Sequence, residues 1–108
     1  MRKEVGRISL EDGRDVIVEM EVQKKIVVEK YLLRAVVKGK VYVKIGDRER
    51  EFYEKVDSKT VSKENIVDVS VADINEIADK IEEDIKAIAI DLYVLLKLAK
   101  KWGWEISF

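Results

Sequence analysis

Cysteine, histidine and proline are all absent from this chain of 108 residues. Without cysteine the chain can form no disulfide framework and offers no thiolate nucleophile. Without histidine it lacks the usual general base and the commonest transition-metal ligand. Most hydrolytic triads and zinc sites are therefore excluded. The five glycines lie at least seven positions apart, so no glycine-rich phosphate-binding loop can be drawn through them.

Long apolar runs are missing too. The longest stretch without a charged residue is Leu92–Leu96, which is far too short for a bilayer span or a secretory signal. We therefore expect a soluble, cytoplasmic protein with a single domain over residues 1–108. Charged residues make up 40% of the chain. This charge content fits a thermostable protein. Together with the lack of proline, it also fits a designed sequence.

Short runs rich in β-branched residues fill the first 70 positions and predict strands joined by tight turns. The turn signals are Asp12-Gly13, Gly39-Lys40 and Gly46-Asp47. A three-residue loop at Asp12–Arg14 would pair Leu10 with Val16 and Ile8 with Val18. A four-residue loop expected at Gln23–Ile26 sets Glu19 opposite Lys30 and Asp15 opposite Arg34. A further three-residue loop is expected at Lys38–Lys40.

The remaining strand predictions concern the hairpin at Gly46 and the segments beyond it. A four-residue loop at Gly46, which places Phe52 opposite Val43, is favoured over a two-residue loop that turns two arginines inward. Ile66–Val71 alternates as a sixth strand, and the alternation after Gly103 predicts a last short strand.

One long helix is predicted from Asp73 to Gly103, with Asp73 as its N-cap and Gly103 as the left-handed residue that ends it. Its core stripe repeats every three or four residues through Ile74, Ala78, Ile81, Ile85, Ile88, Leu92, Leu95, Ala99 and Trp102. The fold class is therefore α+β, a mostly antiparallel sheet (meander) of six or seven strands curled around one long C-terminal α-helix.

The middle of this helix is apolar on the opposite side as well, and this pattern predicts a surface that meets a second chain. The leading functional hypothesis is a non-enzymatic interaction module that forms a homodimer at micromolar concentration. An apolar group on the outer face of the sheet extends the predicted interface. The predicted interface residues are Ala87, Ile90, Tyr93 and Val94 on the helix, and Ile17, Leu32, Val36 and Tyr42 on the sheet.

Two carboxylates leave a second hypothesis open. Glu29 falls on the predicted inner face, and Asp91 interrupts the most apolar part of the helix. If both are buried, they form a pocket for a small apolar ligand or a weak acid–base site, with Tyr31 or Tyr53 as hydrogen-bond donors. Exposure at an edge is the favoured explanation of both carboxylates. A designed scaffold without biological activity is the third hypothesis.

Other charged and aromatic groups have simpler explanations than a binding site. Lys30, Arg34 and Lys44 surround Tyr42 as in single-strand nucleic-acid binders, but the net charge of −1 disfavours a polyanionic partner. Acidic residues in the first half of the helix suit its dipole, so we predict neither a metal site nor a cofactor. Trp102 and Trp104 are expected to close the open end of the sheet rather than to anchor a membrane.

Overall fold

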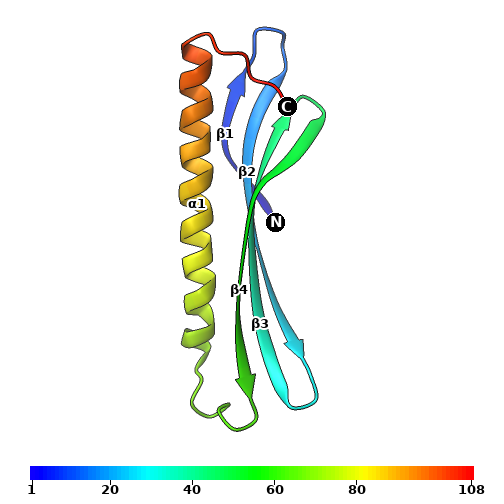
Figure 1. The fold of residues 1–108 in the computed structure, drawn as a ribbon, viewed down its shortest axis with the longest axis vertical. Helices are drawn as coiled ribbons and strands as arrows, with labels where there is room; N and C mark the ends of the chain where they lie inside the picture. Colours follow the sequence, from blue (N-terminus) through cyan, green and yellow to red (C-terminus); the bar gives the residue numbers. More distant parts are fainter.

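The computed structural model describes residues 1–108 and contains four strands followed by one helix (Figure 1). The strands form one antiparallel meander in the order β1-β2-β3-β4, and the helix packs against one face of it. The predicted α+β class and the long C-terminal helix are confirmed, whereas six or seven strands and a curled sheet were wrong. The elements are β1 (Arg2–Ser9), β2 (Asp15–Val28), β3 (Leu32–Ile45), β4 (Arg48–Ser62) and α1 (Val71–Lys101).

Two of the predicted turns are strand interiors, which is why the strands are fewer and longer. Gln23–Ile26 lies within β2, and Gly39 sits in the middle of β3 opposite Val22 and Lys55. Gly39 is there because α1 approaches the sheet closely at this point. A Cβ atom at position 39 would lie 2.3 Å from Cγ1 of Ile85. The glycine thus serves close packing instead of a turn.

The true turns also differ in register from the prediction. Ile8 pairs with Val16, so the first loop is longer than expected. Ile45 pairs with Arg48, which makes the third hairpin the two-residue loop that we did not favour. Gly46 has a φ of 62°, the positive value that a two-residue hairpin needs at its first position. A bulge then leaves Phe52 without a partner in the ladder between Val41 and Tyr42.

The core lies between the inner face of the sheet and one stripe of α1. Its most deeply buried side chains are Val18 and Val41 from the sheet and Ile81 and Ile85 from the helix. The first half of the predicted stripe is confirmed. Leu95 and Trp102 are largely exposed, so the stripe was wrong at its C-terminal end, and Trp102 does not close the sheet.

Both ends of the helix show recognisable capping. Ser70 is the N-cap in place of Asp73, which lies at the third helical position and completes a capping box by accepting from the Ser70 backbone N–H at 2.8 Å. The predicted strand at Ile66–Val71 is therefore wrong, because this segment is the turn that enters α1. Gly103 has a φ of 80° and ends the helix as predicted, but no strand follows it.

The molecule is a rod of 59 × 21 × 16 Å with an uncovered outer sheet face. β1 is about half as long as its neighbours and accompanies only one half of β2 (Figure 1). The other half of β2 is an edge of the sheet. No helix combines the length and the apolar character that crossing a membrane requires.

Candidate functional site

The two candidate catalytic carboxylates are not brought together. Glu29 lies in the turn between β2 and β3, where Arg34 approaches it at 3.6 Å. Asp91 lies in the second half of α1. Both residues are exposed, as the edge interpretation predicted. The expected inward position of Glu29 was wrong because β2 has no turn at Gln23–Ile26, so its even-numbered residues stay inward as far as Val28.

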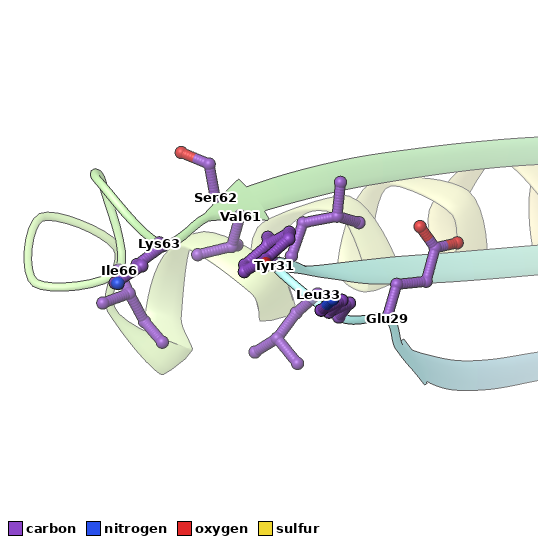
Figure 2. A pocket seen from close by; sticks show the side chains of 9 residues that line it. Glu29, Tyr31, Leu33, Val61, Ser62, Lys63 and Ile66 are labelled. Carbon is purple, nitrogen blue, oxygen red and sulfur yellow. The ribbon is translucent and has the colours of Figure 1, made fainter.

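Glu29 and Tyr31 do share a hollow of about 210 Å³ at the tip of the sheet, whereas Tyr53 packs beside the core. Figure 2 shows this hollow between the β2–β3 turn and the segment that leads into α1. Tyr31 is mostly exposed, and the Lys63 backbone N–H donates to its carbonyl oxygen at 3.1 Å. A single solvated carboxylate beside an exposed tyrosine is not the pair of positioned groups that general acid–base catalysis uses. The arrangement offers a shallow apolar recess and no catalytic constellation.

The predicted apolar group on the outer face of the sheet is not continuous. Tyr42 is covered by the guanidinium of Arg2, which lies 3.6 Å from the centre of its ring. Ile17 stands opposite Lys44, while Leu32 pairs with Ser62 at the far end of the sheet. The continuity followed from hairpin registers that proved wrong.

Cross-strand ion pairs occupy much of this outer face. A side-chain hydrogen bond between Arg2 and Glu49 raises the pKa of the guanidinium and lowers that of the carboxyl group. Lys44 lies 3.0 Å from the Glu19 carboxylate, so the expected partnership of Glu19 with Lys30 was wrong. Several of the cations are therefore locally matched by carboxylates, which weakens their attraction for a polyanion.

The expected pairing of Asp15 with Arg34 was also wrong. Asp15 lies 3.1 Å from Arg7 on β1, and Arg34 lies near Glu29 in the turn. These local pairs follow from the register of the first hairpin and from the continuation of β2 beyond Gln23.

The solvent side of α1 carries most of the helical residues predicted for an interface. Ala87, Ile90 and Val94 are exposed on it, opposite the buried stripe. Tyr93 is different because its ring packs over Gly6 of β1, where an added Cβ atom would lie 2.3 Å from it. Sequence reasoning missed Leu98, although steps of four residues from Ile90 through Val94 lead to it. Leu95 and Trp102, which were assigned to the core stripe, are also exposed beside this face.

Comparison with known proteins identifies no relative of this chain. No protein-family model, curated protein or solved structure matches the chain.

Proposed function

We propose that the protein is a non-enzymatic interaction module that forms a twofold homodimer through the solvent-exposed face of α1. The observation that carries this proposal is the apolar stripe of Ala87, Ile90, Val94 and Leu98 on the side of the helix opposite the core. A helix that is buried on one side gains nothing from apolar residues on its other side unless something covers them.

The charges at the two ends of the stripe favour an antiparallel arrangement. Glu83 precedes Ala87 by four residues, and Lys101 follows Val94 by seven, so both lie on the stripe. If two copies of α1 cross between Ile90 and Val94, each Glu83 comes beside the Lys101 of the other copy. The same patch then meets itself, as a twofold interface requires.

The apolar surface is sufficient for a weak dimer. Ile90 is 41% exposed, Val94 45% and Leu98 36%. Burying a whole side chain of this kind contributes about 1.5–3 kcal/mol, so covering these fractions on both chains contributes about 5 kcal/mol. Leu95 and Trp102 at the margin contribute a similar amount, about 5 kcal/mol. Association costs at least about 4 kcal/mol, which leaves a dissociation constant on the order of tens of micromolar.

Charging the middle of the stripe tests the proposal. Ile90→Glu with Val94→Glu should raise the dissociation constant at least about a hundredfold, because the charges would lie in an apolar contact. The far-ultraviolet circular dichroism and the denaturation midpoint of the monomer should stay close to those of the original protein. A double variant that remains dimeric would show that the helix face is not the interface.

Charge reversal tests the antiparallel register separately. Glu83→Lys should weaken the dimer, and adding Lys101→Glu should restore it, since the pair is then present with its signs exchanged. Glu76→Lys is the matched control, because residue 76 lies on the same side of α1 but beyond the reach of the partner helix. Equal effects of Glu76→Lys and Glu83→Lys would contradict this register.

A further inference from the structure

The second half of β2 is an open edge of the sheet. Arg2 to Ser9 pair with residues 15–21 of β2, so Val22–Val28 pair only with β3. In an antiparallel strand the N–H and C=O groups of alternate residues face each side. About half of these seven residues therefore direct their backbone groups toward an empty strand position, where an extended chain could bind.

The covered half of β2 shows what a neighbouring strand does for this sheet. Beside β1, the inward side chains Val16 and Val18 are 0% exposed. Beyond β1, the inward side chains Ile26 and Val28 are 50% and 75% exposed, although they lie on the same face. The inward side chains of β2 are thus buried where β1 lies beside the strand, and they are exposed where it does not.

A hollow of about 190 Å³ follows the same open edge. Ile26 and Val37 line it from the sheet, and Ile74 and Ala78 line it from α1. An apolar side chain projecting inward from a strand beside β2 would enter this hollow. The unpaired backbone groups of β2 and an apolar hollow for a side chain therefore lie at the same place. Loose packing at the tip of the sheet would not by itself bring the two together.

The charges of this edge select the kind of strand. Lys24 and Lys25 are exposed, and no carboxylate lies within 4.0 Å of either ammonium group. Two copies of this edge would bring like charges together, so pairing with itself is disfavoured. The opposite edge, β4, begins with alternating arginine and glutamate and is interrupted by the bulge at Phe52, features that protect an edge.

We infer that Val22–Val28 is a docking site for an extended segment of a partner protein that adds a strand to β2. The segment alternates apolar residues, which face α1, with acidic residues, which face the side of Lys25. This surface is separate from the exposed face of α1, and either can function without the other.

A designed peptide pair tests the inference on the intact protein. The probe is an acetylated and amidated heptapeptide alternating valine and glutamate, and its counterpart has lysine in place of glutamate. The acidic probe should bind with a dissociation constant on the order of 100 µM, at least about tenfold tighter than the basic one. Proline at two adjacent central positions should abolish binding, because the backbone N–H of one of any two neighbouring residues must donate to β2.

Variants and amide exchange locate the binding. Lys25→Glu should reverse the preference between the two probes, while Arg48→Glu on the opposite edge should leave it unchanged. The acidic probe should slow amide exchange in Val22–Val28 and not in β4. Absence of binding, binding insensitive to proline, or protection of β4 would overturn the inference. Protection of Val22–Val28 that rises with protein concentration without peptide would overturn it too, since a second copy would then be the occupant.

Discussion

Replacing Gly39 by alanine tests the close contact between α1 and the sheet. By strand propensity alone the substitution should stabilise the protein by about 0.5–1 kcal/mol, since glycine inside a strand is unfavourable. The packing predicts the opposite sign. The added Cβ would lie 2.3 Å from Cγ1 of Ile85 and 2.9 Å from Cγ2 of Ile81, whereas carbon atoms prefer about 3.5–4.0 Å. Both isoleucines are fully buried and cannot turn away.

We therefore expect Gly39→Ala to lower the free energy of unfolding by about 2–3 kcal/mol. Urea denaturation at a fixed protein concentration measures this change. Gly13→Ala is the control for backbone strain alone, because Gly13 has a φ of 90° and no atom within 4 Å of an added Cβ. That substitution should cost about 1 kcal/mol.

A double-mutant cycle attributes the cost of Gly39→Ala to the helix contact. Ile85→Ala alone should cost about 2–5 kcal/mol through the cavity that it leaves. Combined with Gly39→Ala, the total should be smaller than the sum by about 1–2 kcal/mol, since the clash with Ile85 is gone and only the 2.9 Å contact with Ile81 remains. A Gly39→Ala protein as stable as the original, or strictly additive costs, would refute the reasoning.

Three further predictions concern the helix. Ser70→Ala removes the N-cap and should cost about 1 kcal/mol in chemical denaturation, with Ser70→Gly costing much less. A side-chain hydrogen bond from Lys55 lowers the pKa of Asp84 below its ordinary value of 3.8. The stability that this pair contributes is therefore complete above pH 3.8 and is lost as the pH falls through the lowered folded-state pKa. Asp84→Asn should flatten this part of the stability–pH curve, and an unchanged slope would contradict the assignment. Asp91→Asn should change stability by no more than about 0.5 kcal/mol, because the carboxylate is solvated, and a larger change would point to a buried role.

The helix could be predicted from the sequence because its signals are long and redundant. The buried positions of Ala78, Ile81 and Ile85 follow from a repeat sustained over many turns, and Gly103 is a strong helix end. The N-cap was misplaced because Ser70 and Asp73 are both good capping residues and form one capping box.

The strands could be predicted only as a class, because a glycine has the same local signal in a turn and in a tightly packed strand. Gly39 predicted a turn, and only the position of Ile85 across the core distinguishes the two. In β2, Lys24 occupies an inward position at the open edge, where it stays exposed. This interruption of the apolar alternation made one long strand resemble two short ones.

The candidate surfaces were only partly predictable because they too depend on contacts between segments that are distant in the sequence. Ile90 and Val94 were found because a helical repeat places them opposite the core. Tyr93 was assigned to the same surface, but its exposure depends on Gly6 of β1, which leaves room for the ring. The open edge of β2 could not be found until the short reach of β1 was known.

The mass of the protein in solution tests the central claim most directly. Light scattering or sedimentation equilibrium reports mass independently of the elongated shape. Between tens and hundreds of micromolar, the mass should rise from the 12.5 kDa of one chain toward twice that value, and Ile90→Glu with Val94→Glu should hold it at that of one chain. A monomer that persists at several hundred micromolar would contradict the proposal that α1 forms a homodimer.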